Sequence, residues 1–330
     1  MEACGGDAET VLQKQEGAVM VTIGIVVLNY QDWELSLRCM ESIRGACGTF
    51  AWRIYLIDNA SKRVMPPSVR NFLKKERARV CFFTADKNRG YASGNNLGIA
   101  CALKDGCGVI VVANSDIVFQ SRAIEAMAVC LMHHPEAGIV GPMVVGTDGS
   151  IQQSCCSMRT GIQEIFQVYT AAKKIYNNKC SAYHCQNRNP YRRAYVYHVS
   201  GCCFAFSAAC AKDLTPLDEG TMLYGEELMI GLRMEQLGYR TIYEPRSVVV
   251  HEHGATTSRM LPLMYQCISQ SELYYCGKYL KAAVWQLWVL YQYRRWLYRL
   301  RCLRDRKLAR YRTTFLAETK KSYRQALIFA

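Results

Sequence analysis

The side chains best suited to chemistry are carboxylates that directly follow apolar segments. Asn114, Ser115 and Asp116 come after a short β-branched run, where a carboxylate can reach a divalent cation that a diphosphate also binds. Such a cation neutralises the charge of a departing diphosphate and supplies the electrostatic part of a group transfer. The structural alternative is a simple turn, which Asn, Ser and Asp all favour.

A second acidic pair, Glu226 and Glu227, opens a segment with helical spacing that ends before Gly238. In the first turn of a helix, carboxylates interact favourably with the helix dipole, which is the structural interpretation. The functional interpretation is a general base that takes the proton from an attacking hydroxyl. A single transfer with inversion needs only one such group.

Two further segments carry polar side chains next to apolar or glycine-rich stretches. His251 ends an apolar strand, where a neutral imidazole can be a metal ligand, although a histidine at a strand end is more often structural. Segment 88–98 places Arg89 and several asparagines among glycines, which let the backbone approach an anionic ligand at a helix N-terminus. It lacks the Gly-x-Gly-x-x-Gly pattern, which argues against a dinucleotide-binding dehydrogenase.

Strands that alternate with helices must position these side chains. Apolar runs predict strands over 21–28, 52–57, 80–83 and 108–113, and helical spacing predicts helices over 32–43, 68–77 and 94–103. This alternation predicts an α/β fold with a doubly wound, mostly parallel sheet, whose ligands bind beyond the carboxyl ends of the strands. Polar residues stand at four such ends: Asn29 and Tyr30, Asp58 and Asn59, Asn88 to Gly90, and Asn114 to Asp116.

A second block of elements follows the first. Strands are predicted over 139–145, 195–206, 241–244 and 248–251, and a helix over 226–237, while the polar stretch 148–193 shows no motif. After residue 265 the composition changes to Tyr, Trp, Leu and Arg. We therefore predict three parts: a flexible leader over 1–19, a catalytic domain over 20–265, and a basic and aromatic helical extension over 266–330.

Charge and cysteine content argue against several classes of protein. The net charge of the 330 residues is +14, and residues 271–330 carry +11 of it, from fourteen Lys and Arg against three acidic residues. A nearly neutral body with a basic attachment is unlike a protein whose whole surface binds nucleic acid.

The 17 cysteines include no Cys-x-x-Cys pair, and the first residues are polar and acidic. Both features predict reduced thiols in the cytoplasm rather than a secreted disulfide scaffold.

The motifs occur in an order that is typical of a known family. Over residues 21–258 the sequence resembles family 2 glycosyltransferases, and within them the bacterial rhamnosyltransferase-like branch. The segments that carry the resemblance are Asn29-Tyr30, 57–61, 88–96, 114–116, Gly225-Glu226-Glu227 with Arg233, 238–240, and His251. The resemblance implies a GT-A fold and an inverting transfer from a nucleoside-diphosphate sugar, a UDP- or dTDP-sugar, with Mn²⁺ or Mg²⁺ as cofactor. The acceptor would be a hydroxyl of a glycan or of a lipid-linked acceptor in cell-surface polysaccharide synthesis.

Positions that match the family's motifs imply roles for single residues. Glu227 would be the catalytic base, Asp116 would bind the metal, and His251 would bind the metal or the diphosphate. Asp58 would contact the nucleobase. The other donor-binding residues would be Asn29, Tyr30, Asn88, Arg89, Gly90, Asn96, Asn114 and Ser115.

The sequence departs from the family's usual pattern near the acidic pair. Glu226-Glu227 stands where Glu-Asp is usual, and Met229 stands where an acidic residue is often found. The triplet Leu-Asp-Glu at 217–219 replaces Phe-Asp-Glu near the expected acceptor side. The choice of catalytic base therefore stays open between Glu226 and Glu227.

Two other functions compete with this hypothesis. A nucleotidyltransferase uses a related sheet and a metal, but it would usually carry a Gly-rich basic loop straight after the first strand, and segment 28–32 lacks one. A basic nucleic-acid-binding module is suggested by nine Lys and Arg between Arg294 and Arg312. Such a module would not need carboxylates at several strand ends, so we expect no nucleic acid partner.

The tail over 273–312 alternates Tyr and Trp with a growing number of Arg. Helices that lie on an anionic membrane surface combine these residue types, because aromatic rings favour the headgroup depth and Arg attracts anionic lipid. The alternative is a pair of amphipathic helices that pack on the catalytic body and leave a solvated basic face. We expect a cytoplasmic protein that is peripheral at the inner face of the cell membrane, and the longest apolar run is too short to span it.

Overall fold

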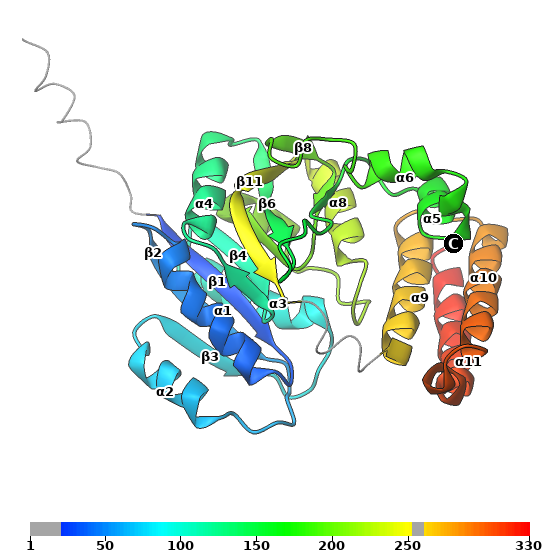
Figure 1. Cartoon of the computed structure of the whole chain (residues 1–330), viewed down its shortest axis with the longest axis horizontal. Helices are drawn as coiled ribbons and strands as arrows, with labels where there is room; N and C mark the ends of the chain where they lie inside the picture. Colours follow the sequence, from blue (N-terminus) through cyan, green and yellow to red (C-terminus); the bar gives the residue numbers. More distant parts are fainter. Residues whose placement is uncertain (1–20, 253–260) are drawn as a thin grey trace, which may run out of the picture.

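A computed structural model describes residues 21–252 and 261–330, which form an α/β body followed by a bundle of helices at the C-terminus (Figure 1). The leader predicted over 1–19 lies outside these residues. The central sheet has the strand order β3-β2-β1-β4-β10-β6-β11-β5, and β8 pairs with β11. The predicted α/β fold with a mostly parallel sheet and a helical extension is confirmed.

The first half of the sheet consists of parallel strands joined by helices. Its strands are β1 (Thr22–Asn29), β2 (Ala51–Asp58), β3 (Val80–Thr84) and β4 (Val109–Asn114). The connecting helices are α1 (Trp33–Ala46), α2 (Pro67–Lys75) and α3 (Tyr91–Lys104). The register pairs Asn29 with Asp58, and Leu28 with Asn114. The polar strand ends therefore lie at one edge of the sheet, as predicted.

The second half of the sheet is mixed. Its elements are β5 (Ile117–Phe119), α4 (Ala123–His133), β6 (Ala137–Val145), β8 (Ala194–Val196), β10 (Cys203–Ser207), α7 (Ala208–Leu214), α8 (Glu226–Leu237) and β11 (Arg240–His251). Strand β10 runs antiparallel between β4 and β6, and Cys203 lies opposite Ala113. The turn just before β10 is therefore at the carboxyl edge of the parallel strands. The helix predicted over 226–237 is confirmed as α8.

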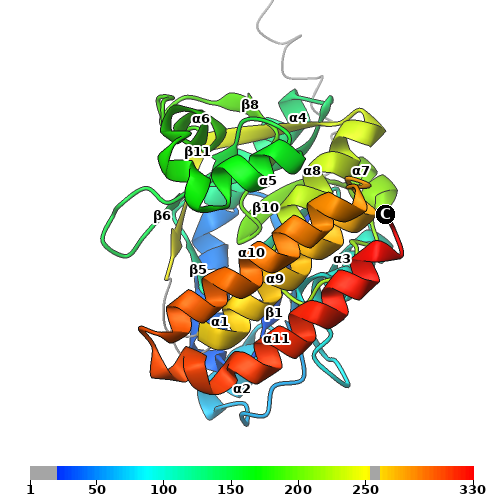
Figure 2. The ribbon, with the colours of Figure 1, turned by 90° about the vertical axis from the view of Figure 1, so that its right-hand side faces the viewer.

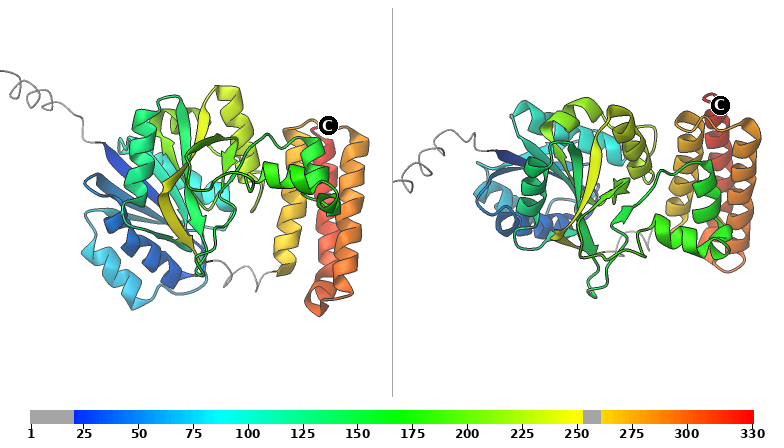
Figure 3. Two further views of the ribbon diagram at one scale, coloured as in Figure 1. Left: turned by 45° about the horizontal axis from the view of Figure 1, so that its top comes forward. Right: turned by 90° about the horizontal axis from the view of Figure 1, so that it is seen from above.

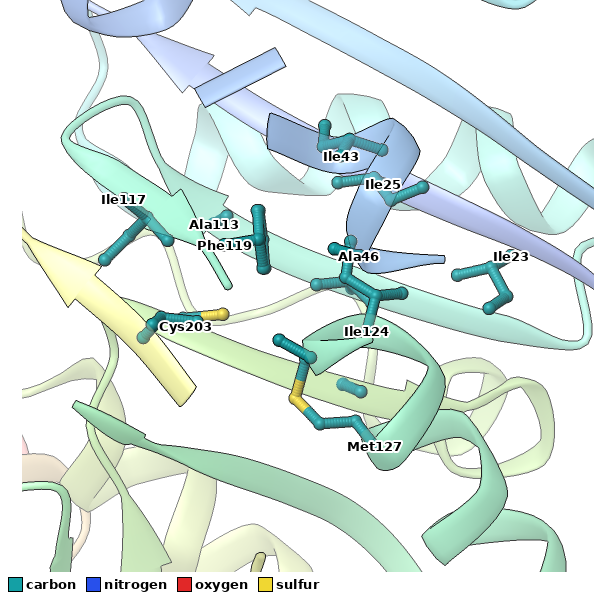
Figure 4. Close-up of a cluster of buried hydrophobic side chains, with 14 of the residues drawn as sticks. Ile23, Ile25, Ile43, Ala46, Ala113, Ile117, Phe119, Ile124, Met127 and Cys203 are labelled. Atoms are coloured by element: carbon teal, nitrogen blue, oxygen red, sulfur yellow. The ribbon is translucent and has the colours of Figure 1, made fainter. Parts of the chain in front are cut away.

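Alternating side chains of the strands fill two cores on opposite faces of the sheet. Ile23 and Ile25 of β1 face α1 and α4, where they pack with Ile43 and Met127 (Figure 4). Val26 faces the other side and packs with residues of α3, α7 and α8. Helices on both faces are what the continuous apolar runs of a doubly wound sheet require.

The structure divides one predicted strand and joins two others. The strand predicted over 195–206 is broken into β8, β9 (His198–Val199) and β10, because β8 pairs with β11 while β9 pairs with β7 (Cys155–Cys156) in a separate sheet. The strands predicted over 241–244 and 248–251 are both part of β11, whose register shifts between Glu244 and Val248. The shift spans Pro245, which has no N–H for the ladder.

The polar stretch 148–193 forms short helices that lie against the C-terminal bundle (Figures 1 and 3). They are α5 (Ile162–Val168), η1 (Ala171–Lys174) and α6 (Asn177–Tyr183). Ile165 of α5 belongs to the same apolar cluster as residues of the C-terminal helices. A stretch without a sequence motif thus becomes part of the support of the bundle.

The C-terminal extension consists of α9 (Leu261–Lys278), α10 (Val284–Cys302) and α11 (Arg306–Leu327), which pack side by side (Figure 2). The boundary predicted at 265/266 lies inside α9. Leu273 and Tyr275 of α9 pack with Leu228 and Met229 of α8, which attaches the bundle to the body. Within the ranges that the structure describes, no helix is long and apolar enough to cross a membrane.

Candidate active site

The ends of β1 and β2 form a buried polar network around Asp58. The side-chain amide of Asn29 donates to Asp58 Oδ1 at 2.9 Å and to Ser61 Oγ at 3.2 Å, and its carbonyl oxygen accepts from Ser36 Oγ at 2.8 Å. Asn29 is fully buried and Asp58 is 4% exposed. The Asn29 side chain thus orients the Asp58 carboxylate, and Asp58 presents the charge of the pair at the edge of the sheet.

The loop from Asn88 to Gly90 is held by the end of β2. The Asn59 amide donates to Asn88 Oδ1 and to the Gly90 carbonyl, both at 3.0 Å, and Asn88 Oδ1 also accepts from the Gly90 N–H at 2.9 Å. Gly90 has φ +102°, and a Cβ there would lie 2.6 Å from the Met222 carbonyl oxygen. Only glycine fits this position. Arg89 stands exposed between two fixed residues.

Asp116 and His251 meet because of the pairing of two short strand segments. Ile117 of β5 lies opposite His251 of β11, and Asp116 comes directly before Ile117. His251 Nε2 lies 3.3 Å from Asp116 Oδ2. Asp116 Oδ1 is buried and has no hydrogen-bond partner among the described residues. An unpaired buried carboxylate oxygen is costly unless a cation or donor reaches it.

Gln152 orients the imidazole of His251. Its amide nitrogen donates to the His251 carbonyl oxygen at 3.4 Å, which directs its Oε1 to His251 Nδ1 at 3.1 Å. The network therefore assigns the ring proton to Nδ1 and turns the lone pair of Nε2 towards Asp116. Two acceptor atoms that converge in this way fit a divalent cation.

Few side chains among the described residues could bind a cation at this point. No group of three or more His, Cys, Asp and Glu side chains that could hold a metal ion exists within 21–252 and 261–330. Asp116 and His251 would thus supply two ligands, and the remaining positions would fall to diphosphate oxygens and water, as is usual for cations that bind with a phosphorylated substrate. The donor set fits Mn²⁺ or Mg²⁺ on these terms.

Glu226 and Glu227 occupy the first turn of α8 but face different surroundings. Glu226 is buried and lines a small cavity with Ala92 and Leu217, and its Oε1 has no partner in the described part of the chain. Glu227 is half-buried, and an atom at the Cβ position of Gly201 would lie 3.6 Å from its Oε2. Burial raises the pKa of both carboxyl groups, and the charge of Glu227 further raises the pKa of Glu226.

The turn at Gly201 and Cys202 connects Glu227 with the Asp116 site. The Cys202 carbonyl oxygen accepts from the Asn114 N–H at 2.9 Å. Burial raises the pKa of the Cys202 thiol to about 12, and the charges of Asp116 and Glu227 both add to this effect. Both carboxylates therefore lie close enough to this turn, at the carboxyl edge of the sheet, for their charges to act on the same thiol.

The remaining predicted donor residues lie at the same edge, with one exception in role. Tyr30, Asn114 and Ser115 are half-buried at the ends of β1 and β4. The Asn96 amide donates to the Leu217 carbonyl at 2.9 Å, and its Oδ1 accepts from the Leu217 N–H at 2.7 Å. In the structure, the Asn96 side chain therefore holds the segment before α8 in place.

Sequence reasoning did not find Gln152 or Gly201. Gln152 lies in the polar stretch without a motif, and its contact with His251 depends on two segments that are far apart in the chain. Gly201 lies in a segment that was predicted to be a continuous strand. The pair Gly201-Cys202 is the one local signal, because a glycine inside a strand pattern often marks a turn or a close approach.

Comparisons with known proteins bear on the family and the fold of the body. The family model "Glycosyl transferase family 2" matches residues 22–207. The N-acetylglucosaminyl-diphospho-decaprenol L-rhamnosyltransferases of two Mycobacterium tuberculosis strains, CDC 1551 / Oshkosh and H37Rv, are each 26% identical over 150 residues, 46% of this chain and 48% of theirs. The match thus spans about half the length of these curated relatives.

Solved structures share the fold. GalNAc-T7 with UDP, GalNAc and Mn²⁺ has a TM-score of 0.54 at 14% identity, over 78% of this chain and 51% of its own. The mannosyltransferase PcManGT of Pyrobaculum calidifontis, in complex with GDP-Man and Mn²⁺, has a TM-score of 0.51 at 15% identity, over 93% and 75%. The body has the GT-A fold, and the chain belongs to glycosyl transferase family 2.

Proposed function

We propose that the protein is an inverting glycosyltransferase that moves a sugar from a nucleoside-diphosphate sugar to a hydroxyl of a lipid-linked glycan acceptor. The observation that carries this proposal is that Asp116 and Glu227 both lie near the turn at Gly201 and Cys202, where the charge of each raises the pKa of the Cys202 thiol. One carboxylate can then serve the leaving diphosphate while the other serves the attacking hydroxyl.

Glu227 acts as the general base. Its carboxylate accepts the proton of the acceptor hydroxyl while the oxygen forms its bond to the anomeric carbon and the bond to the diphosphate breaks. Attack from the face opposite the diphosphate inverts the configuration. Glu227 suits this role better than Glu226, because Glu226 faces Ala92 and Leu217 in the interior.

Asp116, His251 and the strand ends bind the donor. A divalent cation, Mn²⁺ or Mg²⁺, would when bound neutralise the charge of the departing diphosphate. Asp116 Oδ1 and His251 Nε2 would hold it, and Gln152 keeps the imidazole in the orientation this requires. Asp58, oriented by Asn29, would contact the nucleobase, and Arg89 with the backbone of Asn88 to Gly90 would meet the phosphates.

The lipid-linked acceptor is proposed from the curated relatives, whose name gives a decaprenol-linked diphosphate sugar as their acceptor. Helix α10 supports it, because it lies at the side of the bundle away from the sheet (Figures 1 and 2) and exposes apolar side chains. These are Trp285, Trp288, Trp296, Leu300 and Leu303, which are 66%, 50%, 55%, 41% and 83% exposed. Their spacing places them along one side of the helix, the α10 face.

Exposed cations lie next to this face. They are Arg299 near the end of α10, and Arg304, Arg306, Lys307 and Arg310 around the start of α11. Each basic residue near an anionic surface contributes about 1 kcal/mol of attraction. We propose that this surface binds the cytoplasmic leaflet as a peripheral contact and brings the active site to a lipid-linked acceptor.

Incubation with nucleotide sugars tests the reaction. The full-length protein is expected to release nucleoside diphosphate from one member of a UDP-, dTDP- and GDP-sugar panel, in the presence of Mn²⁺ and a polyprenyl-diphosphate-linked N-acetylglucosamine. Release of pyrophosphate from a nucleoside triphosphate and a sugar phosphate would instead indicate a nucleotidyltransferase.

Liposome sedimentation tests the membrane surface. The variant Trp285→Ala/Trp288→Ala/Trp296→Ala is expected to lose binding to phosphatidylglycerol-containing vesicles that the unchanged protein binds at low salt. Tyr191→Ala is the matched control, because Tyr191 is an aromatic residue that is 70% exposed but lies outside the bundle. Equal binding of all three proteins would contradict membrane binding by the α10 face.

A further inference from the structure

A polar cavity of about 240 Å³ lies between the body and the C-terminal bundle, beside Arg89 of the donor motif. Its body side includes Arg89, Glu219, Thr221 and Met222. Its bundle side consists of residues of α9 and α11: Gln270, Tyr274, Glu318, Lys321, Ser322 and Gln325. The bundle thus contributes side chains to a site and does more than cover the body.

Thr221, a residue of the cavity wall, carries a buried hydroxyl that no described residue satisfies. The residue is 6% exposed, and its buried Oγ1 has no hydrogen-bond partner within the described ranges. A buried hydroxyl without a partner destabilises the folded protein unless a ligand or water reaches it. Thr221 therefore marks a point at which a ligand hydroxyl would gain a hydrogen bond.

The walls of the cavity are held in place. Glu219 accepts from the Asn96 amide at 2.9 Å. Tyr274 donates to Asp218 Oδ1 at 2.9 Å, and Asp218 also accepts from Lys278 at 2.7 Å. These contacts join three parts of the chain, which are α3, α9 and the segment that precedes α8. The Tyr274 ring and the Glu219 carboxylate are therefore fixed in position before a ligand binds.

The lining has the chemistry of a carbohydrate site. The charges of Arg89 and Lys321 are balanced by those of Glu219 and Glu318, so the cavity does not select an anion. The lining residues carry amide, hydroxyl and carboxylate groups and one aromatic ring, that of Tyr274, and this combination suits a neutral molecule with many hydroxyl groups. The volume is below the roughly 300–1,000 Å³ of pockets for drug-sized ligands, which suits one sugar residue.

We propose that this cavity binds a sugar residue of the acceptor glycan, so that α9 and α11 contribute to acceptor selection. The assignment to the acceptor rests on the proposed transferase function. A physical connection to the reaction exists, because the Met222 carbonyl accepts from the Tyr91 N–H at 2.9 Å and the same segment continues into the turn that carries Glu227. An occupied cavity would thus steady the segment that leads to the catalytic base.

Two variants and one control test the proposal in the full-length protein. Thr221→Val removes the buried hydroxyl at nearly constant shape, and Lys321→Ala removes an exposed side chain of α11. Lys320→Ala is the control, because Lys320 is exposed beside Lys321 but does not line the cavity. Loss of one hydrogen bond predicts a KM for the N-acetylglucosaminyl diphospholipid acceptor that is about two- to tenfold higher in each variant.

Donor hydrolysis without acceptor and the binding of nucleoside diphosphate with Mn²⁺ should not change in any of the three proteins. Saturation-transfer NMR with free N-acetylglucosamine, L-rhamnose, D-galactose and D-mannose gives a readout that needs no turnover. At least one sugar should bind the unchanged protein and lose signal in Thr221→Val. Binding of none of these sugars, or an acceptor KM and sugar signals that neither variant changes, would overturn the cavity assignment. Failure of donor hydrolysis in the unchanged protein would count against the proposed function alone.

Discussion

Replacement of Glu227 by Gln tests the assignment of the catalytic base most directly. The substitution keeps the size of the side chain and breaks no ion pair, because Glu227 makes none with a described residue. Since burial raises the pKa of this carboxyl group, a neutral amide is compatible with the site. The fold and the affinity for the donor should therefore persist.

The expected loss is one of turnover. Loss of a general base lowers the rate by roughly 10²–10⁴, which corresponds to about 2.7–5.4 kcal/mol of transition-state stabilisation at 1.36 kcal/mol for each factor of ten. The matched control is Glu226→Gln, the neighbouring carboxylate that faces the interior. It should keep turnover within a few-fold of the unchanged protein.

The pH dependence gives a second readout of the same residue. A base works in its ionised form, so kcat/KM should rise with pH through the pKa of Glu227, which lies above the ordinary value of 4.5. This rise should be absent from the residual activity of Glu227→Gln. Initial rates of diphosphate release from pH 4.5 to 8.5, at acceptor concentrations well below KM, measure both effects.

The stability of the control distinguishes the two carboxyl groups further. Because the folded pKa of Glu226 is raised, the folded state holds its proton more tightly, and the free energy of unfolding falls as pH rises from the unfolded pKa through the folded one. Glu226→Gln should therefore unfold at a higher temperature than the unchanged protein at pH 8. Near-normal turnover of Glu227→Gln together with a hundredfold loss in Glu226→Gln would refute our assignment.

Four other substitutions have expected outcomes. Asp116→Ala should abolish the Mn²⁺-dependent part of nucleoside diphosphate binding, measured by calorimetry with and without chelator, and unchanged binding would exclude Asp116 as a ligand. Gln152→Leu should weaken only the same metal-dependent part, by about 10–100-fold, as loss of an orienting partner does. Asp58→Ala should weaken nucleotide binding equally with and without Mn²⁺, and a purely metal-dependent effect would contradict a nucleobase contact. Glu272→Gln should cost about 3–5 kcal/mol in urea unfolding, because it leaves the buried Arg294 guanidinium without its charged partner; a loss below 1 kcal/mol would contradict this.

Much of the body could be predicted from local sequence patterns. The strands β1 to β4 and the helix α8 lie where β-branched runs and helical spacing placed them. Their polar ends gather at one edge because parallel strands all point the same way. The order of these ends along the chain was also enough to indicate the family.

Other features depended on contacts that no local pattern records. The strand predicted over 195–206 is divided because its parts pair with different partners, β11 and β7. Among the described residues the bundle has three helices, and α9 spans Leu261–Lys278, so it includes residues that precede the change in composition. Gln152 and Thr221 lie in segments without a motif. Gln152 contacts His251, and Thr221 shares a cavity with residues of α9 and α11, and these neighbours are far away in the chain.

By itself, the sequence determined the alternation of strands and helices, the polar strand ends and the family, because these depend on residues within one turn or one strand of each other. Only the tertiary structure decided that His251 faces Asp116, that Glu227 rather than Glu226 lies by the turn at Gly201, and that α9 and α11 close a polar cavity. The physical reason is that such meetings depend on the register of distant strands and the packing of helices. Spacing along the chain does not encode either one.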